Sequence, residues 1–419
     1  MKDVHSEQNR ISITLDGLVI MGSAENLGFD SSRLTKITDW MQRYVDEEKF
    51  PGSSILINRH GEEVFYSNVG YRDVEEKLLF QRDTIVRIFS MTKLITSVAL
   101  MTLVEKGLFP LEAPVSEFVP SFNNMRSLVP NAKSIDETEN CETPTIHQLL
   151  THTSGLSYSF NPGLVAQEMS KIGIFDRSDE ITLQDAVKEL SKLPLCFKPG
   201  AKWEYSVSID LLGRVIEIVS GKSLDIFLRD EIFQPLGMQD TAFNISPCSL
   251  DRFSSLYSPV EGNSLELIDQ RDNSPYQNPL LFSGGGGLVG TIDDYMKFGE
   301  MICAGGIYKN HRVLSKKTLE FMRLNHLRGD IASLGPESFA EQPMDGMGFG
   351  LGGAVVLNPG LTRIPGSVGD FGWGGMASTF FWTDPIHNMS IVFFTQLSPS
   401  SSYSNRAELK ALVHSAITV

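Results

Sequence analysis

The stretch TIVRIFSMTKLITSVALMTLV, residues 84–104, decides the fold of this 419-residue chain. It begins as a strand-like apolar run, passes through Ser90-Met91-Thr92-Lys93, and is then apolar on nearly every face from Leu94 to Val104. A helix that is hydrophobic all round is a buried helix, and Lys106-Gly107 supplies a typical helix stop. The sequence therefore predicts a central buried helix with Ser90 at its start.

The segments at the two ends of the chain show strand patterns. Before the central helix, the N-caps Ser31 and Ser32 predict a helix, and residues 54–58 and 63–69 predict a hairpin. Near the other end, residues 379–382 and 389–395 predict two strands around a turn. A last amphipathic helix carries Leu409, Leu412, Val413 and Ile417. Together these segments favour one α/β lobe built from both ends of the chain.

The middle of the chain has a different pattern. Its clear elements are helical, and they are expected over 145–151, 183–193 and 209–219, with long loops between them. Residues 284–287 are expected to form a close-packed glycine strand, and 292–302 an amphipathic helix. We therefore predict an α/β (α+β) protein with an N-terminal arm over 1–30, an α/β lobe over 31–115 plus 281–419, and a mostly helical lobe over 116–280. Ligand sites often lie between such lobes.

Composition excludes several function classes. A formal net charge of −15 disfavours non-specific binding to nucleic acid or to anionic membranes. No segment reaches the ~18 consecutive apolar residues of a membrane span, so we expect a cytoplasmic protein. The four cysteines are scattered, which favours free buried thiols. His147 and His152 lack the spacing of a metal motif, and we expect neither a metal nor a cofactor.

Three separate motifs carry candidate chemistry. Ser90 and Lys93 share one face of a helix, and a serine hydroxyl needs a base beside it to attack a carbonyl. Tyr205 stands just before an apolar helix, from which its phenol can accept or donate a proton. In 372–376, glycines let the backbone approach a ligand, and an N–H there can face a developing oxyanion. Taken singly, the same motifs also fit a helix-surface pair, a buried tyrosine and a glycine-rich turn.

In combination and in this order the motifs resemble the family of class C β-lactamases and penicillin-binding-protein-like serine hydrolases, in its esterase branch, the family VIII carboxylesterases. The resemblance runs from about residue 33 to 415. It rests on Ser90-Met91-Thr92-Lys93, Tyr205-Ser206-Val207 and Trp373-Gly374-Gly375, and it is supported by further stretches at 149–156, 198–203 and 285–295.

The resemblance implies a fold and a set of roles. The fold would be an antiparallel sheet flanked by helices, with a helical lobe beside it (β-lactamase/transpeptidase-like). Ser90 would be the nucleophile, and Lys93 and Tyr205 would move its protons, with the choice of base between them left open. The backbone N–H groups of Ser90 and Met376 would form the oxyanion hole. The expected substrate-binding residues are Trp373, Gly374, Gly375, Tyr158 and Phe160, of which the last two would shape an acyl pocket.

Two departures from the family pattern narrow the function. Val207 replaces the asparagine of Tyr-x-Asn, and Trp373-Gly374-Gly375 replaces Lys-Thr-Gly, so an amide and a cation are both lost. Strong β-lactamase action is therefore not expected, and we predict a serine carboxylesterase for small or short-chain acyl esters. The alternatives are acyl transfer to a small-molecule alcohol and a weak β-lactamase or D-aminopeptidase-like activity. A non-catalytic ligand-binding module is the rival from another class. The expected partner is a small-molecule ester, and a homodimer is left open.

Overall fold

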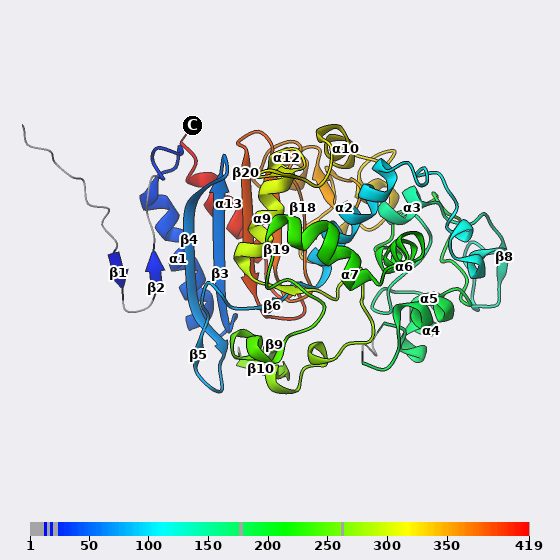
Figure 1. Ribbon diagram of the computed structural model, residues 1–419, viewed down its shortest axis with the longest axis horizontal. Coiled ribbons are helices and arrows are strands. Elements are labelled where there is room, and N and C mark those ends of the chain that lie inside the picture. The colour runs from blue at the N-terminus through cyan, green and yellow to red at the C-terminus, as the bar shows by residue number, and fades with distance from the viewer. Residues whose placement is uncertain (1–11, 15–16, 20–23, 176–178, 261–263, 419) are drawn as a thin grey trace, which may run out of the picture.

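The computed structural model of the protein describes residues 12–14, 17–19, 24–175, 179–260 and 264–418. At its centre is an eight-stranded sheet in which each neighbouring pair is antiparallel. In spatial order the strands are β16 (Met347–Phe349), β17 (Ala354–Val356), β18 (Phe371–Gly374), β19 (Phe380–Asp384), β20 (Met389–Thr395), β3 (Gly52–Arg59), β4 (Glu62–Asp73) and β5 (Leu78–Leu79). The pairing of β20 with β3 joins the two ends of the chain, as the adjacent red and blue strands of Figure 1 show.

The alternation of side chains along the strands produces the layers of the fold. Ile55 and Ile57 on β3 pack under α1 (Ser31–Asp46) and α13 (Asn405–Ser415), whereas Leu56 between them faces the opposite layer. That opposite layer contains α2 (Thr92–Glu105) and α9 (Ile292–Cys303). α2 is buried along almost its whole length, as its all-round apolar sequence predicts.

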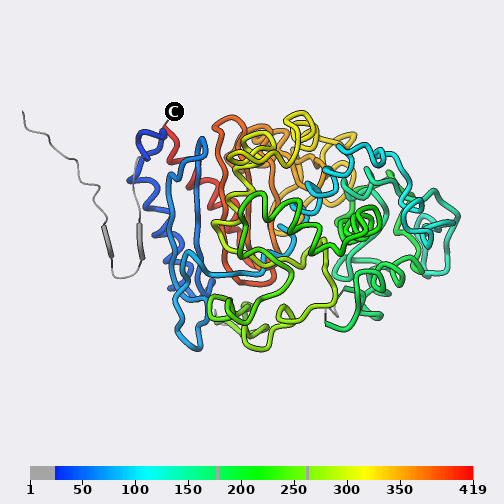
Figure 2. The backbone as a smooth tube through the Cα atoms, in the orientation of Figure 1, coloured from blue at the N-terminus to red at the C-terminus, as the bar shows by residue number. Residues whose placement is uncertain are grey.

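Several further helices lie at the end of the molecule away from α1 (Figures 1 and 2). They are α3 (Ile146–Leu150), α4 (Leu164–Ile172), α5 (Leu183–Leu190) and α6 (Ser208–Ser220), and α7 (Leu224–Leu228) connects to them by packing against α6 and α2. α6 contacts α2, α3 and α5, so the middle of the chain packs directly against the buried helix. The division into an arm and two lobes stays a prediction, and much of the predicted arm lies outside the described residues.

The predicted fold class is confirmed, and the predicted helices and sheet strands occur within a few residues of their expected bounds. Three local predictions were wrong. The N-cap of α1 is Asp30, whose carboxylate accepts the N–H groups of Ser32 and Arg33. The stretch 284–287 is a turn and not a strand, because the Ser283 carbonyl accepts the N–H groups of Gly286 and Gly287.

The third correction concerns the strand-like run before Ser90. Only β6 (Val86–Arg87) is a strand, and it pairs with β11 (Val289–Gly290) outside the eight-stranded sheet. The glycine-rich stretch 372–376 was expected to precede a strand. Its first three residues instead belong to a strand, since β18 ends at Gly374. The four cysteines are free as expected, but Cys248 is exposed and the other three are only partly buried.

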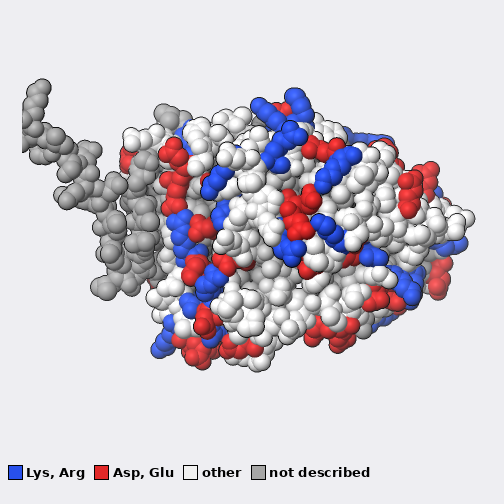
Figure 3. Space-filling view, viewed as in Figure 1, with Lys and Arg blue, Asp and Glu red and all other residues white. Residues whose placement is uncertain are grey.

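Charged side chains of both signs are interspersed over the face shown in Figure 3, without a continuous patch of one sign. Within the described ranges, no helix has the length and apolar character required to cross a bilayer. The same residues contain no group of three or more His, Cys, Asp or Glu side chains arranged to hold a metal ion. A cluster of buried polar side chains does lie around Ser90.

Candidate active site

Ser90 lies in a single 3₁₀ turn, Phe89–Met91, that runs directly into α2. Phe89 has a φ of 42°, a left-handed conformation that costs free energy in a bulky residue and often marks functional sites. Neighbouring segments hold the turn: the Tyr295 hydroxyl donates to the Met91 carbonyl (2.9 Å), and the Ile88 N–H to the Leu288 carbonyl (3.1 Å). The Ser90 hydroxyl is thereby fixed at the N-terminal end of a rigid helix.

Lys93 is fully buried one turn further along, and its amine makes three hydrogen bonds. Nζ lies 2.6 Å from the Gly285 carbonyl oxygen, 2.8 Å from the Tyr158 hydroxyl and 3.2 Å from Ser90 Oγ. A neutral amine has two N–H donors and one lone pair. When the two donors point at Gly285 and Tyr158, the lone pair points at Ser90. The geometry therefore suits Lys93 to accept the serine proton.

Tyr205 lies in the loop before α6, with its ring against the lysine. Its centroid is 4.6 Å from Lys93 Nζ, and its hydroxyl accepts a hydrogen bond from Trp373 Nε1 at 3.0 Å. Within the described residues, no hydrogen bond joins Tyr205 to Ser90, although both line the same cavity. An indole N–H can only donate, so the phenolic proton of Tyr205 is free to point at another acceptor.

Tyr158 was expected to shape an acyl pocket, but its hydroxyl bonds to the amine of Lys93. Burial, together with Asp210 and Tyr205, raises the pKa of Tyr158 well above its usual range, so its phenol stays protonated near neutral pH. Phe160 stacks on the Tyr158 ring at 4.7 Å and is itself about half exposed. The sequence signal for this contact was weak, because the loop also offers the hydroxyls of Ser157 and Ser159.

His152 connects the loop that carries Tyr158 to the loop that carries Tyr205. Its Nδ1 accepts the Ser206 N–H at 3.2 Å and lies 2.9 Å from Ser206 Oγ. Burial, and secondarily the nearby Lys93, lowers the pKa of His152 well below its usual value, so the imidazole is neutral. The structure therefore gives His152 a bracing contact and no role as a proton carrier.

The predicted oxyanion-hole residue Met376 follows β18 in the turn 375–378. A Cβ at Gly375 would lie 2.4 Å from the Ile88 carbonyl oxygen, so only glycine lets this turn approach the chain just before Ser90 so closely. The Met376 N–H has no hydrogen-bond acceptor among the residues described. This free donor, close to the nucleophile, is the arrangement that an oxyanion hole requires.

Two cavities meet at the nucleophile, because Ser90, Phe160 and Met376 line both. The larger has a volume of about 340 Å³ and contains Tyr205, Trp373, Gly374 and Gly375 in its wall. The second, of about 270 Å³, has Tyr158, Tyr276 and Asp210 in its wall. An ester has an acyl part and an alcohol part on either side of the carbonyl carbon, and two adjoining cavities can receive one part each.

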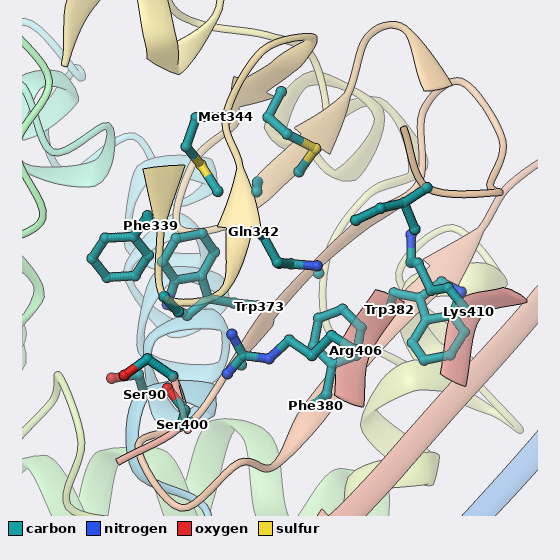
Figure 4. A pocket seen from close by; sticks show the side chains of 18 of the residues that line it. Ser90, Phe339, Gln342, Met344, Trp373, Phe380, Trp382, Ser400, Arg406 and Lys410 are labelled. Atoms are coloured by element: carbon teal, nitrogen blue, oxygen red, sulfur yellow. The ribbon is translucent and has the colours of Figure 1, made fainter. Parts of the chain in front are cut away.

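The larger cavity is mainly apolar and extends from Ser90 past Arg406 to Lys410 (Figure 4). Both basic residues belong to α13, and each is paired: Arg406 with Glu341 at 3.3 Å, and Lys410 with Asp370 at 2.7 Å. A Cβ at Gly374 would lie 2.5 Å from the Arg406 guanidinium, which would have to shift to admit a larger residue. No sequence pattern indicates these two pairs, because their partners are 65 and 40 residues apart.

The chain is similar to known proteins both in sequence and in structure. The family model described as Beta-lactamase matches residues 37–415. Protein Rv1367c of Mycobacterium tuberculosis is 32% identical over 80% of this chain and 83% of its own length. Esterase EstB of Burkholderia gladioli is 30% identical over 87% of this chain and 90% of its own. The solved structure of EstCE1, a hydrolase with promiscuous acyltransferase activity, superimposes with a TM-score of 0.76 at 26% identity, covering 94% and 99% of the two chains.

Proposed function

The chain belongs to the Beta-lactamase family and is a serine hydrolase, and from this premise we propose that it is a carboxylesterase for short-chain acyl esters. The single observation that carries the proposal is the position of Lys93 Nζ, 3.2 Å from Ser90 Oγ, with its other two hydrogen bonds directed elsewhere. The similarity to Esterase EstB supports the choice of ester substrates.

In the proposed acylation step, Lys93 takes the proton of Ser90 while Oγ attacks the ester carbonyl carbon. The N–H groups of Ser90 and Met376 stabilise the oxyanion of the tetrahedral intermediate, and such a donor is typically worth about 3–4 kcal/mol in the transition state. The C–O bond to the alcohol then breaks. The alcohol leaves with a proton from Tyr205, whose phenolic hydrogen is free because its oxygen accepts from Trp373, and Tyr205 regains that proton from Lys93.

In the proposed deacylation step, a water molecule attacks the acyl-enzyme and loses a proton to the same pair of residues. The bond from the carbonyl carbon to Oγ breaks, Ser90 regains its proton and the carboxylic acid leaves. The larger cavity, with its mainly apolar wall, suits a short acyl chain or a compact alcohol, since sites for small molecules typically occupy about 300–1,000 Å³.

The test is turnover of p-nitrophenyl butyrate by the wild type and by Ser90→Ala. We expect the substitution to lower kcat/KM by at least about 10³-fold, because it removes the hydroxyl that forms the acyl-enzyme. A fluorophosphonate probe should label Ser90 in the wild type and leave Ser90→Ala unlabelled. Undiminished turnover by Ser90→Ala would overturn the assignment, and an unlabelled, inactive wild type would favour the non-catalytic binding module.

Acyl transfer to an alcohol is the second candidate. It is favoured by the second cavity of about 270 Å³ beside Ser90, which leaves room for an acceptor while the acyl group occupies the first. EstCE1, which is 26% identical to this chain, is a hydrolase with promiscuous acyltransferase activity. Product ratios measured with added alcohol decide between the two reactions. A transfer product that stays undetectable at high alcohol concentration rules the second candidate out.

The remaining alternatives are weaker on the same geometry. Val207 is fully buried and has no amide to offer a β-lactam or a D-amino acid amide, so we expect slow turnover of a chromogenic cephalosporin. A cytoplasmic location stays a prediction of the sequence, and cell fractionation tests it. Homodimer formation is likewise tested by sedimentation velocity.

A further inference from the structure

A carboxylate that the proposed mechanism does not use lies buried beside the site. Asp210 is in the first turn of α6, five residues after Tyr205, and is only 1% exposed. One of its oxygens, Oδ1, accepts the Gly285 N–H at 3.0 Å and the Ser283 hydroxyl. Within the described part of the chain, no Lys or Arg pairs with it. A buried carboxylate without a direct counter-ion is costly, so a compensating role is expected.

Gly285 connects this carboxylate to the catalytic amine. Its N–H donates to Asp210, and its carbonyl oxygen accepts from Lys93 Nζ at 2.6 Å. A Cβ at position 285 would lie 2.2 Å from Asp210 Oδ2, so the turn and the carboxylate are in close contact. The direction of the Lys93 amine therefore depends on where Asp210 holds this turn.

Burial raises the pKa of Asp210 above its usual value, while Lys93 and the hydrogen bonds from Ser283 and Gly285 act to lower it, so the carboxylate also interacts with the amine through its charge. Lys93 gains a positive charge when it takes the proton of Ser90, and a carboxylate one glycine away favours that charged form through a low-dielectric interior. The two are not in direct contact, so Asp210 does not hold the ammonium as a salt bridge would. The titratable groups that face Asp210 in the described structure are Lys93 on α2 and Tyr158 on the loop after α3.

We propose that Asp210 is a positioning residue of this esterase site: it holds the turn 283–287 so that Lys93 points at Ser90, and its charge stabilises the ammonium formed during acylation. The inference rests on the proposed function. It adds a fourth side chain to Ser90, Lys93 and Tyr205, one that lies in the wall of the second cavity and acts on the reacting atoms through Lys93.

The test compares Asp210→Asn with the wild type on p-nitrophenyl butyrate over a range of pH. The amide keeps the size and an oxygen acceptor for Gly285 but removes the charge. We expect the plateau of kcat/KM to fall about 10- to 100-fold, through kcat and not KM. We also expect the acid limb of the profile to move to lower pH, because a lysine without the nearby carboxylate loses its proton more easily.

Two further variants keep the test decisive. Ser283→Ala removes one hydrogen bond to Asp210 and should lower kcat by a smaller factor, so the test stands even if Asp210→Asn does not fold. Asp384→Asn is the matched control: Asp384 is also buried and accepts a serine hydroxyl, from Ser367 at 2.7 Å, but it ends β19 outside the walls of both cavities. Asp384→Asn should leave the acid limb of the pH profile unchanged.

The outcomes separate the two proposals. If the wild type hydrolyses the ester and is labelled at Ser90, but Asp210→Asn keeps the wild-type plateau and limb, the inference about Asp210 fails alone. A lower plateau with an unmoved limb also overturns it, since that result describes a purely structural residue. If Asp210→Asn does not fold, an unchanged kcat in Ser283→Ala overturns it. A wild type without ester turnover or labelling instead rejects the proposed function.

Discussion

Arg87 and Lys93 are two fully buried basic side chains only six residues apart, but they differ in the kind of group that contacts their charge. Arg87 has a direct counter-ion: its Nε donates to Asp269 at 2.7 Å. Its other nitrogens donate to Ser254 and Ser274, and its guanidinium stacks over Phe253. Lys93 contacts two hydroxyls and one carbonyl and, within the described residues, no carboxylate.

The difference separates a structural group from a candidate catalytic one. A direct carboxylate partner fixes a cation and makes its proton hard to remove. An amine held only by neutral acceptors keeps its orientation and can still exchange its proton with a neighbouring hydroxyl. The carboxylate that Lys93 does have nearby, Asp210, is kept one residue away, behind Gly285.

Lys93→Met is expected to have the largest effect of the substitutions considered. Loss of the proposed base should lower kcat/KM by about 10³-fold or more. The unfolding free energy should stay near the wild-type value or rise, because a buried amine without a counter-ion is replaced by an apolar side chain of similar length. Ester turnover and urea denaturation measure the two effects. A variant that loses several kcal/mol of stability would show that Lys93 is structural, like Arg87.

Arg87→Met should have the opposite profile. Removing the guanidinium leaves Asp269 and the Ser254 carbonyl without their partner, and breaking such a buried pair typically costs about 3–5 kcal/mol of unfolding free energy. Activity per folded molecule should fall much less than in Lys93→Met. The control is Arg126→Met, because Arg126 is exposed and its loss should cost no more than about 0.5 kcal/mol. Equal urea midpoints for Arg87→Met and the wild type would contradict the structural role.

Lys410, a buried cation with a direct carboxylate partner like Arg87, is expected to keep its charge and to act on the neighbouring His414. The pH dependence of stability tests this effect. Burial, and secondarily the neighbouring Lys410, lowers the pKa of His414 to about 4. The unfolded chain binds this proton first, below about pH 6.5, so stability is lost as the pH falls from there toward the folded value. Between pH 7 and pH 5 the wild type should lose about 1–2 kcal/mol that His414→Gln does not lose. Urea titrations at both pH values measure this, with the exposed His60→Gln as control; equal losses in all three proteins would refute it.

The parts of the site that were predictable from the sequence are those carried by short contiguous motifs. Ser90 and Lys93 are three residues apart at the start of a helix whose burial follows from its composition, and the structure places Tyr205 beside Lys93 and Trp373 beside Tyr205. The same local rule placed most helices and strands, because periodicity reports which face of an element is buried.

What could not be predicted depends on contacts between distant segments and on backbone atoms. The acceptor at Gly285 is a carbonyl, which every residue has, so no residue type marks it. In the sequence, Asp210 is an ordinary acidic residue in the first turn of a helix. Only the structure shows that it contacts the turn 283–287. The glycines 284–287 predict a close-packed strand but form a turn, because both structures favour the same residue type.

Trp373→Phe should have the smallest effect. It tests whether the hydrogen bond from the indole to the Tyr205 hydroxyl contributes to catalysis. The family pattern offers a cation at this position, whereas here a neutral indole donates to the Tyr205 hydroxyl at 3.0 Å. Phenylalanine keeps an aromatic ring beside Tyr205 but removes that donor. We expect kcat to fall about tenfold, or about 1.4 kcal/mol, because a Tyr205 oxygen that has given up its proton loses its hydrogen-bond donor.

The matched control is Phe339→Leu, since Phe339 stacks on Trp373 at 5.6 Å without offering a hydrogen bond. It should change KM more than kcat, because it alters the wall of the larger cavity and leaves the Tyr205 oxygen bonded. If Trp373→Phe changes only KM as well, the indole is a wall residue. The proton of Tyr205 would then have to be controlled by Lys93 alone, whose amine lies 4.6 Å from the centre of the tyrosine ring.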